Sequence, residues 1–294
     1  MFFFISGYIA YKSSIIWNVH LYRFNLKKKA IVQLIPTAFF FSLFCFNQGG
    51  NPISIFLSTG LGGYWFTFVL FEMFCIFYTV SLFPKSFFNV IMISLSGLGI
   101  ISLVFFRSDV QWWNVLCMEN LCKYFQFFTL GLLCRKYNIQ FLNLMRNDLF
   151  KTLMMLVFLV SLFIITRTSW GVESFIGKNL IRSILIRYSS LFVVFSFFVS
   201  KEGFFNQETR FNKWIRFVGR RTLDIYLIHY FLIPVLPNNF SPIIKDNAIF
   251  EAFFPSIIAL MIIAICLIVS EVIRSSEFLA HYLLGVKLDK YQLK

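Results

Sequence analysis

The sequence predicts an all-α fold, a polytopic transmembrane helical bundle with about eight full spans and a partial first one. Three observations indicate this class. Hydrophobic residues make up 59% of the 294 residues and aromatic residues 20%, a composition far more apolar than that of soluble domains. Apolar runs near the length of a bilayer crossing recur from end to end. The basic residues also collect in alternate connections between these runs.

The apolar runs define the expected elements in chain order. They cover residues 1–11, 31–46, 64–83, 87–106, 112–134, 152–167, 182–200, 222–237 and 253–273. The first run is short, because a helix of this size extends about 16 Å, roughly half of a bilayer core. We expect the runs to form one membrane-embedded domain over residues 1–294, with residues 274–294 as a cytoplasmic tail.

The net charge of +14 is best explained by membrane topology, because the basic residues are unevenly distributed between the two sets of connections. Most of the 27 Lys and Arg lie in the connections 12–30, 84–86, 135–151 and 201–221 and in the tail. The opposite connections hold only Arg107, Arg167, Lys178, Arg182 and Lys245. Since cytoplasmic loops are enriched in Lys and Arg, the pattern predicts a multi-pass protein of the inner (plasma) membrane with a cytoplasmic C-terminus. It indicates a lipid bilayer as partner and not a nucleic acid.

Cysteine and histidine do not form a recognisable ligand pattern. The six Cys include no CxxC pair, and the three His are scattered. The cysteines are typical of small buried hydrophobic residues, and the sequence predicts no metal site.

The stretch RFVGRRTLDIYLIHYFLIP, residues 216–234, is the best place to look for chemistry. We expect a turn at Gly219 and an N-cap at Thr222, whose hydroxyl can accept from a free N–H of the first turn. Asp224 then lies in that first turn, where a negative charge suits the helix dipole. Tyr226, His229 and Tyr230 follow at i, i+3 and i+4 on one face. Such a stripe should face protein or a water-filled cavity.

Other polar residues in apolar runs have two interpretations each. Glu72 is either a functional carboxyl or a protonated group bonded to a neighbouring helix. Asp224 either takes part in chemistry or pairs with Arg220 four residues earlier. The cations of the expected loop between residues 12 and 29 either anchor the chain at the headgroups or bind phosphate.

Several stretches, in order, resemble the acyltransferase-3 family of integral-membrane O-acyltransferases. They are FFFISGYIAYKS at 2–13, KKKAIVQLIP at 27–36, YWFTFVLFE at 64–72, KYFQFFTLGLLCRKY at 123–137, VGRRTLDIYLIHYF at 218–231 and HYLLGVK at 281–287. The resemblance covers essentially the whole chain. It implies transfer of an acyl group, typically acetyl, from acyl-CoA to a sugar hydroxyl of a bacterial surface polysaccharide or its precursor.

The resemblance also has a departure. The first helix of the family carries an Arg and a His about three helical turns apart, and this sequence begins at what resembles the end of the second helix. We therefore expect an N-terminally truncated member that could be inactive as it stands. The alternatives are a transporter or polysaccharide flippase, and a catalytically dead fragment. The oligomeric state stays open.

The resemblance implies roles for two groups of residues. The catalytic candidates are His229, Tyr226, Asp224 and Glu72, with His229 lining the acyl or acceptor path or only supporting the bundle. Lys27, Lys28, Lys29, Arg220 and Arg221 are the candidates for binding the phosphates of acetyl-CoA, which would enter as the acyl-donor substrate without a metal.

Overall fold

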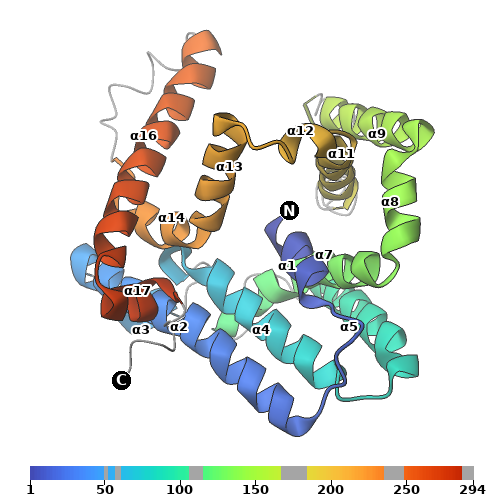
Figure 1. Cartoon of the computed structure of the whole chain (residues 1–294), viewed down its shortest axis with the longest axis horizontal. Helices are drawn as coiled ribbons and strands as arrows, with labels where there is room; N and C mark the ends of the chain where they lie inside the picture. The colour runs from blue at the N-terminus through green and yellow to red at the C-terminus, as the bar shows by residue number, and fades with distance from the viewer. Residues whose placement is uncertain (50–51, 57–60, 106–114, 167–183, 235–247, 287–294) are drawn as a thin grey trace. The chain divides into compact units, whose positions relative to one another are not determined.

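The structure is a computed structural model that describes residues 1–49, 52–56, 61–105, 115–166, 184–234 and 248–286. Every regular element in these ranges is a helix, which confirms the all-α prediction (Figure 1). Three of these helices are long and apolar enough to cross a membrane, namely Val19–Asn47, Lys85–Leu103 and Phe253–Arg274. The total of about eight spans stays a prediction.

The chain divides into two compact units. One unit contains Met1–Ser14 and Leu130–Trp214, and the other contains Ile15–Thr129 and Ile215–Lys294. The single membrane-embedded domain expected over the whole chain stays a prediction.

The larger unit is built on two helices that lie side by side, α2 (Val19–Gln48) and α4 (Trp65–Val80) (Figure 1). Between them in sequence are the short α3 (Pro52–Phe56) and the 3₁₀ turn η1 (Leu61–Gly63). A hydroxyl pair, Thr37 and Thr67 with 2.6 Å between their Oγ1 atoms, joins α2 to α4 in the buried interface. After α4 come α5 (Lys85–Phe105), the turn η2 (Val115–Cys117) and α7 (Met118–Lys136).

The later part of the larger unit returns to α2. It consists of α14 (Thr222–Ile228), the 3₁₀ turn η4 (His229–Phe231), α16 (Ala248–Arg274) and α17 (Glu277–Leu284). α14 contacts both α2 and α16, and α17 packs on α2. A buried cluster fills the space between these elements, with Phe40, Tyr64, Leu227, Ile228, Cys266 and Leu284 at its centre.

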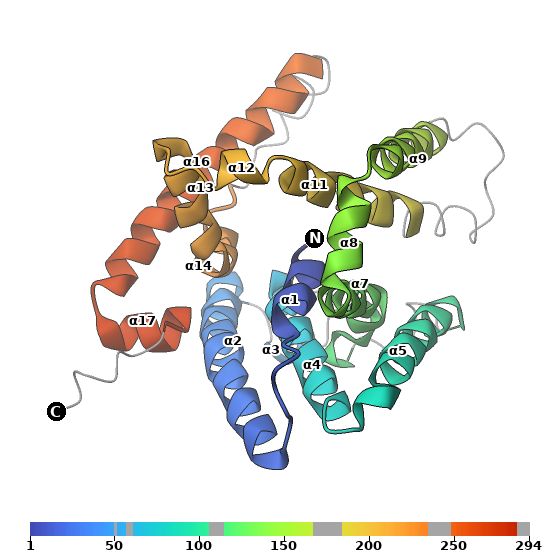
Figure 2. The same cartoon turned by 45° about the vertical axis from the view of Figure 1, so that its right-hand side comes forward.

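The smaller unit contains α1 (Phe2–Ala10), the end of α7, α8 (Asn138–Arg146), α9 (Asp148–Thr166), α11 (Ile186–Ser200) and α12 (Glu202–Phe205). α8 and α9 meet at a bend of 74°, and α11 packs along both (Figure 2). The helix α13 (Arg210–Arg220) begins in this unit. A Cβ atom at Gly131 would lie 2.1 Å from the carbonyl oxygen of Phe4, so glycine is required where α1 crosses α7.

The boundary expected between the 12–30 loop and the following helix is wrong for a local reason. The loop expected at 12–30 is helical from Val19 onward, because Asn18 caps α2 by accepting a 2.7 Å hydrogen bond from the N–H of Leu21. The Leu, Lys and Ala that follow are good helix formers. The short 1–11 element is confirmed as α1.

The expected turn at Gly219 and the expected N-cap at Thr222 are also wrong. α13 continues through Gly219 to Arg220, and the break falls at Arg221. The Thr222 hydroxyl donates to the carbonyl of Gly219 at 2.8 Å. The last carbonyls of a helix lack intrahelical partners, and this hydroxyl satisfies one of them.

The apolar helix expected over 222–237 is shorter than predicted. α14 ends at Ile228, and η4 carries the chain only to Phe231. Pro234 restrains the residue before it from helical geometry, which explains an end in this region. Residues 235–237 of this prediction lie outside the described part of the chain, as do the five cations counted on the opposite side.

Candidate functional site

The candidate site is formed in the larger unit by α14 and η4, which lie against the N-terminal end of α4 and against α16. The stretch at residues 216–234, which the sequence indicated for chemistry, therefore contains one side of the site. Segments from residues 63–66 and 270–274 supply its other polar partners.

Two tyrosines of this wall converge on one backbone carbonyl. The hydroxyls of Tyr226 and Tyr230 donate to the carbonyl oxygen of Gly63 at 2.7 and 2.8 Å. Tyr226 also accepts from the N–H of Phe66 at 3.1 Å. In the reverse direction, the Tyr64 hydroxyl donates to the carbonyl of Leu227 at 3.0 Å. These bonds attach α14 and η4 to the start of α4.

Gly63 is required for this arrangement. Its φ angle of +103° lies in the region that side chains rarely adopt. A Cβ atom at this position would lie 2.3 Å from ring atoms of Tyr230. The tyrosine can therefore approach the turn only because residue 63 has no side chain.

The ring of His229 is held by its own helix. Its Nδ1 lies 2.7 Å from the carbonyl oxygen of Tyr226 and 3.2 Å from that of Ile225. A carbonyl oxygen can only accept, so Nδ1 carries the proton and Nε2 of the neutral ring carries the free lone pair. The ring centroid lies 4.0 Å from that of Tyr230. His229 thus offers a basic nitrogen in a fixed orientation.

Asp224 is 1% exposed and belongs to a buried ionic cluster. Its Oδ2 accepts from Ser270 Oγ at 2.6 Å and from two nitrogens of Arg274 at 2.7 and 3.0 Å. Arg274, and not Arg220, is therefore the partner of Asp224. Both partners lie near the C-terminal end of α16.

The two arginines proposed for phosphate binding have different surroundings. Arg221 forms a 2.6 Å ion pair with Glu271 of α16 and is largely buried. Arg220 is exposed at the end of α13. Arg221 therefore adds a second ionic link between α14 and α16, while Arg220 faces outward.

The three lysines near the start of α2 also differ. Lys27 and Lys28 are exposed, whereas Lys29 is half-buried with its Nζ 3.8 Å from the ring centroid of Phe74. Gln33 follows one turn later with a buried Oε1 that has no hydrogen-bond partner among the described residues. The cation–π contact orients Lys29 toward α4, away from its two neighbours.

Glu72 lies on α4 about two turns from its start. Its Oε2 is buried and has no hydrogen-bond partner within the described ranges. A buried carboxyl without a partner is costly, so this oxygen is available to a polar ligand.

Comparison with known proteins gives one result. A family model described as an acyltransferase domain matches residues 1–271. The chain belongs to the acyltransferase-3 family. Neither the curated proteins nor the solved structures that were compared contain a match. Membership supports a membrane-embedded acyltransferase, in agreement with the apolar helices.

In this acyltransferase-3 chain the structure brings together only part of the predicted site. Asp224 and Tyr226 lie on α14, and His229 lies on η4. Arg221 is the N-cap residue of α14. Sequence reasoning missed Gly63, Tyr64, Ser270 and Arg274, which hold these side chains in place. The sequence contains no local signal that pairs Asp224 with an arginine fifty residues later.

Proposed function

We propose that the chain is the acyl-transfer part of a membrane O-acyltransferase, with acyl-CoA as the donor and a sugar hydroxyl as the acceptor. The acyl group is acetyl, and the acceptor is a bacterial surface polysaccharide or its precursor. The protein lies in the plasma membrane with its C-terminus in the cytoplasm. The observation that carries this proposal is His229, whose Nδ1 bonds to backbone carbonyls and leaves Nε2 as a base.

The chemistry follows from that orientation. Nε2 of His229 takes the proton of the acceptor hydroxyl as the oxygen attacks the thioester carbonyl. The new C–O bond forms, the C–S bond breaks, and the imidazolium returns the proton to the departing thiolate. Histidine suits both steps because its charge changes near neutral pH.

The other candidates have supporting roles. The hydroxyls of Tyr226 and Tyr230 are engaged with Gly63, so they position η4 and the His229 ring. Glu72 offers a buried oxygen that a sugar hydroxyl can satisfy as a donor. The exposed Lys27, Lys28 and Arg220 are suited to the phosphates of CoA.

The test is acyl transfer from radiolabelled acetyl-CoA in membranes that contain the protein, with surface polysaccharide as the acceptor. If His229 serves as the base without the Arg and His of the family's first helix, label should appear in an alkali-labile ester and depend on His229. No label would show that His229 does not serve as the base in the absence of that pair. Label that appears equally in membranes without the protein would overturn the proposal. Uptake of polysaccharide across the membrane without ester formation would instead favour transport.

A further inference from the structure

The helix α2 has a break in its hydrogen-bond ladder where α17 packs against it. Pro36 lies inside α2 and has no N–H, so the carbonyl of Val32, one turn earlier, lacks its usual helical donor. A Cβ atom at Gly285 would lie 2.7 Å from this carbonyl oxygen. The C-terminal end of α17 therefore lies directly on the carbonyl that Pro36 leaves without a helical donor.

Only glycine fits at position 285. Gly285 is the C-cap of α17 with a φ angle of +65°, which residues with a side chain rarely adopt. A Cβ atom at this position would also lie 3.0 Å from the Cα atom of Val32. Glycine thus ends α17 and brings its backbone against the backbone of α2 at the same residue.

The turn after α17 is ordered by bonds within the tail. The N–H of Val286 donates to the carbonyl of Ala280 at 3.0 Å. Nδ1 of His281 lies 2.7 Å from the carbonyl oxygen of Val286 and donates to it, because a carbonyl can only accept. Leu284 is buried in the same cluster as Phe40 of α2. The contact with α2 therefore belongs to a bonded and packed structure.

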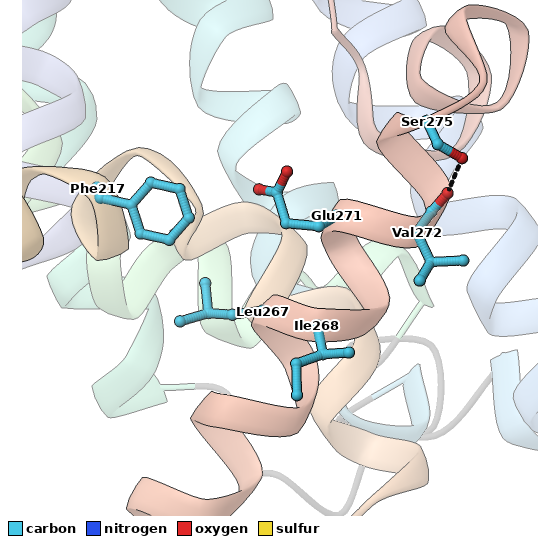
Figure 3. A pocket seen from close by; sticks show the side chains of 6 residues that line it. All are labelled: Phe217, Leu267, Ile268, Glu271, Val272 and Ser275. Atoms are coloured by element: carbon cyan, nitrogen blue, oxygen red, sulfur yellow. Dashed lines mark hydrogen bonds between the residues drawn. The ribbon is translucent and has the colours of Figure 1, made fainter.

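The start of α17 is attached to the last turn of α16. Figure 3 views the groove beside this turn and shows the Ser275 hydroxyl donating to the carbonyl of Val272, at 2.7 Å. Ser276 then caps α17 by accepting from the N–H of Leu279. The connection between the two helices is short, and both of its serine side chains are bonded.

α17 thereby connects the two parts of the proposed reaction site. Just before its start, Arg274 pairs with Asp224 of α14, the helix that leads into His229. At its end, the contacted Val32 lies one helical turn after Lys28 on the same face of α2. Lys28 is one of the exposed cations suited to the phosphates of CoA.

We propose that α17 with its C-cap Gly285 is a brace that positions the acyl donor, an inference that rests on the proposed function. The brace holds the kinked part of α2, and the cations that bind the CoA phosphates, in a fixed place relative to His229. Binding energy from the phosphates can then orient the thioester for attack. Gly285 and Pro36 act through α2, so they are positioning residues.

Hydrogen exchange of the α17 amides, measured in detergent, tests the brace itself. Gly285→Ala places a side chain against Val32 and should raise the exchange rates by on the order of tenfold or more. Gly49→Ala is the matched control, because Gly49 is also a left-handed C-cap but a Cβ atom there meets open space. It should leave exchange in α17 unchanged. Equal exchange in the wild type and Gly285→Ala would overturn the proposal.

Pro36→Ala is a second variant, and it adds no clash. It returns an N–H to the carbonyl of Val32 and should straighten α2, so exchange in α17 should rise again. Pro255→Ala removes the proline inside α16 and should leave exchange in α17 unchanged. The same exchange in both proline variants would contradict the role of the Pro36 break.

Two acyl donors test the positioning role. Ester formation is measured in membranes with acetyl-CoA and with S-acetylpantetheine, which lacks the phosphates. Relative to Gly49→Ala, Gly285→Ala should lower kcat/KM for acetyl-CoA by on the order of tenfold and leave kcat/KM for S-acetylpantetheine unchanged. Equal losses with both donors would show structural support only and overturn the proposal.

The same measurement separates the brace from the proposed function. Wild-type membranes that form no ester would contradict the proposed function and the positioning role together. Ester formation that Gly285→Ala leaves unchanged would contradict the positioning role alone.

Discussion

At the scale of single residues, His229 combines a fixed ring with a free Nε2. If Nε2 is the base, His229→Ala should lower the rate of acyl transfer by about 10²- to 10⁴-fold, with unchanged membrane expression. Added imidazole should restore part of the activity, because it replaces the missing base. The measurement is ester formation at saturating acetyl-CoA. A small loss without imidazole rescue would reduce His229 to a packing residue.

Gly63 gives a residue-scale prediction about stability. Gly63→Ala forces a side chain into a left-handed turn and against Tyr230, so it should destabilise the protein by about 3 kcal/mol or more. Gly97→Ala in α5 is the matched control, because a Cβ atom there meets open space. It should be neutral or stabilise by up to about 1 kcal/mol. Thermal unfolding in detergent measures both, and equal melting temperatures would contradict the role given to Gly63.

At the scale of elements, α14 and α16 are joined by two ion pairs. Asp224→Asn leaves Arg274 largely buried without its carboxylate, which should cost about 3 kcal/mol. Combining it with Arg274→Gln should cost less than the sum of the single changes. Asp148→Asn breaks an exposed pair with Lys151 and should change stability by less than about 1 kcal/mol. If Asp224→Asn and Asp148→Asn cost the same, Asp224 is not an ionic anchor.

The elements also show what a sequence can predict. Apolar runs locate α4, α5 and α16, because a long helix in lipid needs a long apolar stretch. The start of α2 was misplaced, since lysines were taken as a loop although Asn18 and the following residues favour a helix. The helix predicted over 222–237 was too long, because the apolar run continues past the residues where α14 and η4 end, before Pro234.

At the scale of the whole molecule, the candidate site depends on contacts between distant parts of the chain. The sequence predicts Tyr226, His229 and Asp224 from spacing within one segment. It cannot predict that the Gly63 carbonyl oxygen accepts hydrogen bonds from two tyrosine hydroxyls, or that Arg274 forms an ion pair with Asp224. These partners are far apart in the sequence and meet only in the folded chain. Local patterns indicate which side chains are unusual, and the tertiary structure decides which of them have partners.

The net charge of +14 leads to a prediction about the proposed acyl-CoA donor. An exposed cationic surface attracts the phosphates of CoA, and salt screens this attraction. The KM for acetyl-CoA should therefore rise with ionic strength. Lys27→Gln with Lys28→Gln should raise it about fivefold at low salt, with little change in kcat, and should weaken the salt dependence.

The control for this effect is Lys85→Gln with Lys201→Gln, which removes the same charge at other exposed positions. If Lys27 and Lys28 contact the phosphates, the control should leave the KM nearly unchanged, because a contact depends on position and a general field does not. Equal shifts in the two double variants would show that only the overall charge attracts the donor. An unchanged KM in both would remove Lys27 and Lys28 from the donor site.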